Sequence, residues 1–98
     1  MRFLICGDVV GNAGKEIIIK NVPLLRKNES IDFVIINGEN SFNGFGITKE
    51  ICEKFYSIGV DVITSGNHIW DHKKIMSFID SDQRLLRPLN YPKTAPGK

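Results

Sequence analysis

The sequence between residues 32 and 40 reads Asp32-Phe33-Val34-Ile35-Ile36-Asn37-Gly38-Glu39-Asn40, an apolar run that passes directly into polar residues. The apolar run predicts a strand over residues 32–36 that is buried on both faces. After a turn at Gly38, the chain presents Glu39. An acidic side chain directly after so apolar a strand rarely lacks a partner, which makes Glu39 the first candidate for a functional residue.

Two further apolar runs end in the same way. Phe3 to Cys6 leads into Gly7-Asp8, and Val60 to Thr64 leads into Ser65-Gly66-Asn67-His68. We expect both runs to be strands, the first of them buried on both faces. Residues 84–86 are expected to start a fourth strand. The remaining residues, 87–98, contain three of the four prolines and predict an extended loop.

Helical patterns separate these strands. A first helix is expected from about Ala13, with Pro23 kinking or dividing it. Thr48 is a good N-cap for a second helix, which Gly59 closes. Asp71 can cap a third helix. The apolar residues expected on the buried faces of the three helices are Ile18, Val22, Leu25, Ile51, Cys52, Phe55, Ile58, Ile75, Phe78 and Ile79.

The resulting order, β-α-β-α-β-α-β with short connections, predicts an α/β fold with a mostly parallel sheet flanked by helices. In such sheets, ligands bind outside the carboxyl ends of the strands. The three polar strand ends are Gly7-Asp8, Asn37 to Asn40, and Gly66 to His68. We therefore expect them to converge on one rim of the sheet, and this is the strongest functional signal in the residues themselves.

The side chains on that rim suit a site for metal ions and phosphate. Asp8 and Glu39 bring carboxylates, Asn40 and Asn67 bring amide oxygens, and His68 brings an imidazole. Hard divalent cations bind the oxygens, and iron, manganese and zinc also accept imidazole. Two cations held roughly 3.5–4 Å apart can clamp a phosphate and activate a water molecule.

The individual residues also have structural interpretations. Asp8 would be a helix-capping or turn residue, Asn67 a left-handed turn residue, and His68 a packed or solvent-bonded loop histidine. Nearby, His72 is interpreted as an exposed residue in the first turn of the third helix, and Trp70 as a packing anchor. Only the combination of all three strand ends favours a functional site over these interpretations.

Size and composition limit the fold and the partners. The 98 residues fit one domain spanning residues 1–98. Thirteen Lys and Arg against 11 Asp and Glu give a net charge of +2, too small to indicate a nucleic-acid or membrane partner. Cys6 and Cys52 lie in apolar runs, as reduced core residues do. The N-terminal apolar run is too short for a signal peptide, so a cytoplasmic location is expected.

Three segments together resemble a known family. They are Gly7-Asp8-Val9-Val10-Gly11, Asn37-Gly38-Glu39-Asn40 and Gly66-Asn67-His68-Ile69-Trp70-Asp71. They are similar to the motifs of the calcineurin-like metallophosphoesterases, and most similar to those of the YmdB-like phosphodiesterase branch. The wider superfamily carries Asp-x-His in its first motif, whereas Val10 stands at the histidine position here. Glu39 likewise replaces the usual bridging aspartate, and both departures favour the YmdB-like branch.

The resemblance implies a role for each residue on the rim. Asp8, Glu39 and Asn40 would bind a first metal ion, which Glu39 would bridge to a second ion bound by Asn67. His68 would be the general acid that protonates the leaving oxygen. The implied cofactors are two metal ions, iron or manganese. The implied reaction is hydrolysis of 2′,3′- and 3′,5′-cyclic nucleoside monophosphates.

The same resemblance implies that the chain is the N-terminal part of a four-layer α-β-β-α sandwich whose C-terminal half is absent. Three further metal-binding histidines of the family lie beyond the matched region, and this chain contains only His68 and His72. We therefore expect weak metal binding, little activity and an exposed apolar face or edge. Two alternatives remain: a non-catalytic nucleotide- or phosphate-binding module, and an interaction protein that associates through its open face, for instance as a homo-oligomer.

Overall fold

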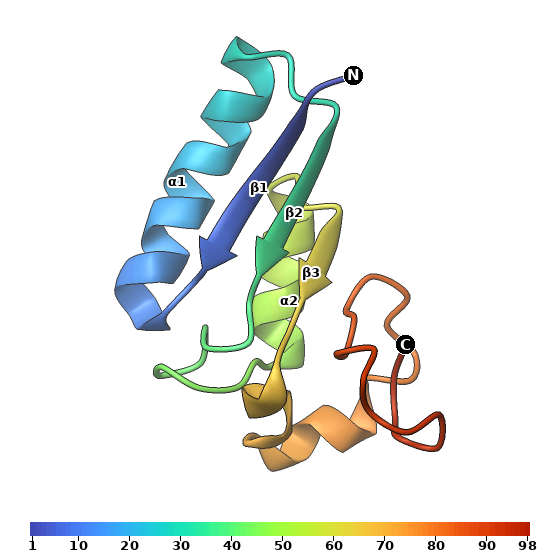
Figure 1. Ribbon diagram of the computed structural model, residues 1–98. Helices are drawn as coiled ribbons and strands as arrows, with labels where there is room; N and C mark the ends of the chain where they lie inside the picture. Colours follow the sequence, from blue (N-terminus) through green and yellow to red (C-terminus); the bar gives the residue numbers. More distant parts are fainter.

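The computed structural model describes residues 1–98 as a three-stranded parallel sheet with two helices and two short 3-10 turns (Figure 1). In chain order, the elements are β1 (Phe3–Asp8), α1 (Gly11–Asn28), β2 (Phe33–Asn37), α2 (Lys49–Ser57), β3 (Val62–Thr64), η1 (Asn67–Trp70) and η2 (Lys73–Ser77). The strands pair in the order β1-β2-β3. The predicted α/β class with a parallel sheet is confirmed.

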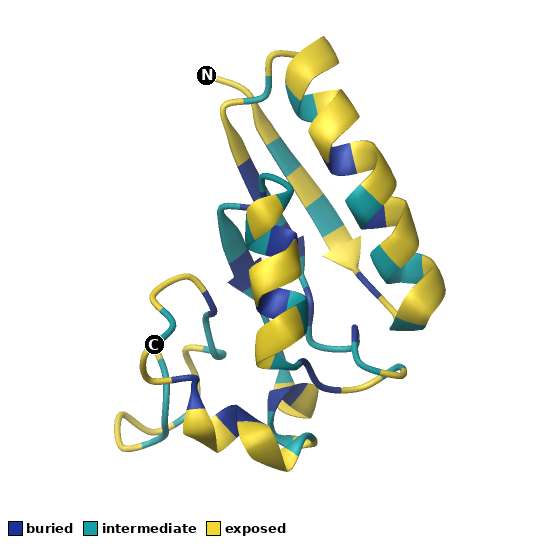
Figure 2. Ribbon diagram, turned by 180° about the vertical axis from the view of Figure 1, so that it is seen from behind, coloured by how far each residue is buried: buried dark blue, intermediate teal, exposed yellow.

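Both helices cover the same face of the sheet. The chain crosses the sheet in one direction, so right-handed crossovers place α1 and α2 on one side. Accordingly, α2 lies behind the strands in Figure 1 and in front of them in Figure 2. The strand residues that point to this side, among them Val34, Ile36 and Ile63, are fully buried and form the core with apolar residues of the helices.

The opposite face of the sheet is open. Phe3 and Ile5 of β1 are 58% and 69% exposed, and Phe33 of β2 lies edge-on to Phe3 with ring centroids 6.0 Å apart. The predictions that β1 and β2 are buried on both faces are therefore wrong. The reason is that only one layer of helices covers the sheet, which agrees with the molecule's shortest extent of 19 Å. The expected exposed apolar face is present.

Helix α1 is continuous through Pro23, so the predicted kink or division is wrong. It also begins at Gly11, two residues earlier than expected. Ile18 and Val22 hold the helix on the core before the proline, and Arg26 anchors it afterwards by donating to the carbonyl oxygen of Gly59 at 2.6 Å. Leu25, expected in the core, is 40% exposed.

Helix α2 matches its sequence signals closely. The Thr48 side chain accepts a hydrogen bond from the Ile51 N–H at 3.2 Å, which is the predicted N-cap. Cys52 and Phe55 are buried, and Gly59 follows the helix end with φ of +108°. Both cysteines are free thiols, as predicted. None of the helices combines the length and the apolar composition needed to span a bilayer.

The predicted third helix and fourth strand are wrong as elements, although their apolar residues are placed correctly. His72 has extended backbone, with φ of −93° and ψ of 115°, and the helix expected after Asp71 is only the short 3-10 turn η2, while residues 67–70 before it form η1. Residues 84–86 form a single parallel bridge between Leu85 and Ile63 instead of a strand. The segment bonds to β3 through the Ile63 N–H, which donates to the Arg84 carbonyl, and through the Leu86 N–H, which donates to the Ile63 carbonyl, both at 2.9 Å. Ile75, Phe78, Ile79 and Leu85 are all buried.

Candidate metal and phosphate site at the strand ends

Asp8 and Asn40 are brought together at the carboxyl ends of β1 and β2. The register of the two strands shifts between Cys6 and Asp8, so that Asp8 rather than Gly7 lies opposite Asn37. Asn40 Nδ2 then donates to both oxygens of Asp8, at 2.8 and 3.1 Å. Asp8 does not cap α1, whose N-cap position has no side-chain hydrogen bond. The structural interpretation of Asp8 as a helix cap is therefore wrong.

The Asn40 side chain has one atom that the protein leaves unused. Its Oδ1 is buried and has no hydrogen-bond partner, although the Nδ2 of the same amide is paired with Asp8. A buried acceptor without a partner is uncommon in folded proteins and calls for an explanation such as an ion or a water molecule. The backbone around it is well fixed, because Gly11 N–H donates to the Asn40 carbonyl at 3.0 Å.

Glu39 lies against the loop that follows β3. Its Oε2 accepts from the His68 N–H at 3.3 Å. The carboxylate also packs directly on Gly66, where an added Cβ would meet Oε2 and would lie 2.6 Å from Glu39 Cδ. Gly66 has extended backbone, with φ of −140°, so only this contact demands glycine there. The fit joins the ends of β2 and β3.

Asn67 and His68 open η1, and both are exposed. The positive-φ residues other than glycine are Ser30 and Asn43, so Asn67 is not a left-handed turn residue. The Asn67 side chain forms no hydrogen bond with the rest of the chain. Its place on the rim agrees with the sequence prediction, and its ligand role stays a prediction.

His68 is paired with Asp71, which the sequence predicted to be a helix cap. His68 Nδ1 lies 2.6 Å from Asp71 Oδ2. This hydrogen bond is the main cause that raises the pKa of His68, and the negative charges of Glu39 and Asp8 raise it further. Asp71 does not cap a helix as predicted. The signal that could have identified the pair is the spacing of three residues, which brings side chains to one side of a helical turn.

The acidic and imidazole groups do not all meet at one point. Asp8 pairs with Asn40, and Glu39 lies against Gly66 and the His68 backbone. No three side chains of the His, Cys, Asp and Glu types come close enough to share one metal ion. The rim therefore presents two adjoining pairs of groups, with two carboxylates, an unpaired amide oxygen and an imidazole as available donors.

His72 is not the exposed helix residue that the sequence predicted. It is half-buried, and its ring meets Phe42 edge-on, with centroids 4.7 Å apart and an interplanar angle of 87°. The prediction failed because it assumed a regular helix, in which a first-turn residue would point to solvent. Trp70 packs edge-on against Tyr91 at 5.6 Å, in keeping with a packing anchor.

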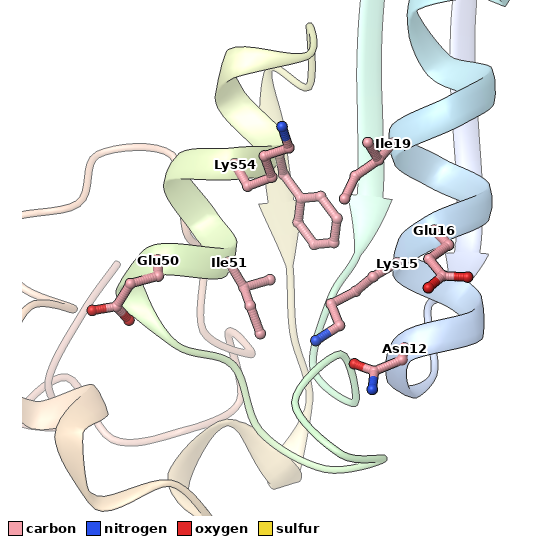
Figure 3. A pocket seen from close by; sticks show the side chains of 8 residues that line it. Asn12, Lys15, Glu16, Ile19, Glu50, Ile51 and Lys54 are labelled. Carbon is pink, nitrogen blue, oxygen red and sulfur yellow. The ribbon is translucent and has the colours of Figure 1, made fainter.

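A cleft of about 280 Å³ lies between α1 and α2 (Figure 3). Its floor is apolar, formed by Ile19, Ile51 and Phe55, and charged side chains such as Lys15 and Glu50 surround it. None of the predicted site residues lines it. The cleft therefore does not compete with the strand ends as the place of the predicted chemistry.

Comparison with known proteins gives consistent matches over the whole chain. A family model described as YmdB-like protein matches residues 4–98. The chain is 46% identical over its 98 residues to the 2′,3′-cyclic-nucleotide 2′-phosphodiesterase of Bacillus subtilis (strain 168), covering 37% of that protein.

Two solved structures also match. A crystal structure of a hypothetical protein from Thermus thermophilus is 38% identical and superposes with a TM-score of 0.90, covering all of this chain and 38% of the other. A crystal structure of a novel phosphatase from Mycoplasma pneumoniae is 36% identical with a TM-score of 0.86, covering 95% of this chain and 33% of the other. The chain thus spans about a third of the length of these proteins, between 33% and 38%.

Proposed function

The chain belongs to the YmdB-like family, and on that premise we propose that it carries the strand-end part of a metal-dependent phosphodiesterase site. We propose cyclic nucleotides as substrates, with the 2′,3′-cyclic nucleoside monophosphates first and the 3′,5′ compounds second. The name of the Bacillus relative supports the 2′,3′ class. The observation that carries the proposal is the meeting of Asp8 with Asn40, and of Glu39 with the His68 loop, on one rim.

The donor set suits a metal centre. Asp8, Glu39 and Asn40 would hold the first ion, with Glu39 bridging and Asn67 on the second. The buried Asn40 Oδ1, which has no partner in the protein, supports this assignment. Carboxylate and amide oxygens fit manganese, and imidazole nitrogen elsewhere in a site fits iron equally well. When bound, such ions supply positive charge for the phosphate oxygens and lower the pKa of a bound water.

In this proposal, Glu39, His68 and Asp71 each have a separate role. The Glu39 carboxylate packs on Gly66, and this contact holds it beside the His68 loop. His68 would donate a proton from Nε2 to the leaving oxygen of the ester, because Asp71 occupies its Nδ1. Asp71 raises the pKa of His68, which favours the protonated imidazole that a general acid needs.

The test is turnover of a 2′,3′-cyclic nucleotide by the full-length natural protein with manganese present. Glu39→Gln removes the charge with little change in shape, and we expect it to lower kcat at least about 100-fold. Glu50→Gln, an exposed acidic residue in the first turn of α2, is the matched control and should leave turnover unchanged. Wild-type turnover in Glu39→Gln, or turnover that excess chelator leaves intact, would refute the proposal.

A further inference from the structure

The loop that follows Asn40, residues 41–46, is closed by its own hydrogen bonds. Phe42 N–H donates to the Gly46 carbonyl at 2.9 Å, and Phe45 N–H donates to the Phe42 carbonyl at 3.0 Å. The buried Ser41 hydroxyl donates to the Gly38 carbonyl at 2.7 Å, which ties the loop to the end of β2. The loop therefore moves as one unit with Glu39 and Asn40, which immediately precede it.

This loop docks on His72. Gly46 is buried with φ of +80°, and an added Cβ there would lie 3.2 Å from His72 Cβ and 3.3 Å from its backbone nitrogen. On the neighbouring side, the Phe42 ring meets the His72 ring edge-on at 4.7 Å. Phe42 and Gly46, the two ends of the closed turn, thus both rest on one side chain.

The contact depends on the shape of the His72 ring rather than on hydrogen bonds. Nδ1 of His72 is buried without a partner, and no other atom of the ring bonds to the protein. Burial of an unpaired nitrogen is unfavourable, so an apolar ring of the same shape could replace it with little loss. His72 itself directly follows Asp71, the partner of the candidate acid His68.

From this arrangement we infer that His72 is a positioning residue, which through Phe42 and Gly46 holds the Glu39–Asn40 segment in register with the His68 loop. The inference rests on the proposed function, because it assigns His72 a role in that same site. The direct bond between the two segments, His68 N–H to Glu39, is 3.3 Å long and so near the weak end of the range. Ring packing at His72 supplies the rigidity that this bond lacks.

Amide hydrogen exchange on the 98-residue chain tests the inference without any need for turnover. His72→Ala should speed exchange at Phe42, Phe45 and His68 about ten-fold, the size of a contact coupling of roughly 1.4 kcal/mol. His72→Phe, which keeps the ring, should restore slow exchange. Phe3→Ala is the matched control, because it removes another edge-on aromatic pair at the far end of the sheet.

Turnover of the full-length natural protein provides the second measurement. His72→Ala and Phe42→Ala should each lower kcat about ten-fold with KM nearly unchanged, and the double variant should lose no more than either single one. Phe42→Leu replaces Phe42→Ala if the latter fails to fold. Independent, additive losses, or unchanged exchange at all three amides in His72→Ala, would overturn the inference. A wild-type protein without turnover would refute only the proposed function, and exchange would still decide the role of His72.

Discussion

The two ends of the sheet differ in whether their carboxylates are paired with a cationic side chain. At the amino end, Arg26 Nη1 lies 2.7 Å from Asp61 Oδ2, and the same oxygen accepts from the Val34 N–H at 2.8 Å. At the carboxyl end, Asp8 is exposed and Asn40 Oδ1 is buried without a partner. Charge at the amino end is matched within the protein and holds the fold together. At the carboxyl end, His68 pairs with Asp71, but the carboxylates of Asp8 and Glu39 form no salt bridge, as suits a binding site.

The lowered pKa of Asp61 reflects its pairing with donors at the amino end. Partial burial alone would raise it, but the hydrogen bonds from Val34 and Arg26 and the charge of Arg26 outweigh burial and lower it. The carboxyl end has the opposite character, since Asp71 and the nearby carboxylates raise the pKa of His68. One end therefore stabilises an anion, and the other places negative charge around the His68 imidazole.

The largest expected effect comes from adding one methyl group at the carboxyl end. Gly66→Ala would drive the Glu39 carboxylate away from the His68 loop, because the new Cβ overlaps it. We expect turnover of the full-length natural protein to fall on the order of 100-fold, since small misplacements of reacting groups have effects of that size. Gly7→Ala is the matched control: its Cβ would meet nothing within 4 Å. Equal activity of the two variants would show that the fit of Glu39 on Gly66 is not needed.

At the amino end, the expected effect is on stability alone. Arg26→Met keeps much of the side-chain volume but removes the Arg26 donor from Asp61 and from the Gly59 carbonyl. We expect the free energy of unfolding to fall by about 2 kcal/mol, measured by urea denaturation. Turnover at temperatures where the variant is folded should not change. A large loss of turnover in folded Arg26→Met would contradict the claim that the amino end serves stability and not function.

The Arg26→Met variant should also change how the free energy of unfolding depends on pH. The folded-state pKa of Asp61 is lowered, so its contribution to stability is present above the unfolded pKa of about 3.9 and is lost as pH falls through the folded value. Wild-type stability should therefore fall as the pH is lowered below about 4, and Arg26→Met should show a smaller part of that fall. Parallel curves of stability against pH would contradict the assigned ion pair.

The smallest expected effect is on the pKa of His68. Asp71→Asn should lower the pKa of His68 toward its ordinary value, because the main cause of the raised pKa is lost. A raised folded-state pKa stabilises the protein below the unfolded value and loses that contribution as pH rises through the folded one. Titration of the His68 ring resonances by NMR in excess chelator measures the change. An unchanged His68 pKa would show that Asp71 does not hold the proton on the imidazole.

The convergence of the strand ends could be predicted from sequence because its signals are local. Each apolar run ends in polar residues, and parallel topology alone brings those ends to one rim. Thr48 and Gly59 likewise act within their own helix, and both were placed correctly. The position of Asp8 opposite Asn37 was not predictable, because it follows from the register shift at Gly7 in the paired strands.

The errors lie where tertiary contacts override local pattern. Pro23 should have broken α1, but core packing before it and the Arg26 bonds after it keep the helix whole. A helix should have begun after Asp71, but His72, on which Gly46 packs, has extended backbone. As a result, the Asp71 side chain pairs with His68 instead of capping a helix. Contacts between residues distant in sequence carry no local signal.

The most direct test of the central claim is to ask where manganese binds on the 98-residue chain. Substoichiometric Mn²⁺ should broaden the amide NMR signals of Asp8, Asn40 and His68, and EDTA should restore them. Signals of Arg26 and Asp61 at the other end of the sheet should stay sharp, as should those of Glu50 and Glu53 on α2. Equal broadening at the two ends, or broadening confined to α2, would contradict a metal site at the carboxyl ends of the strands.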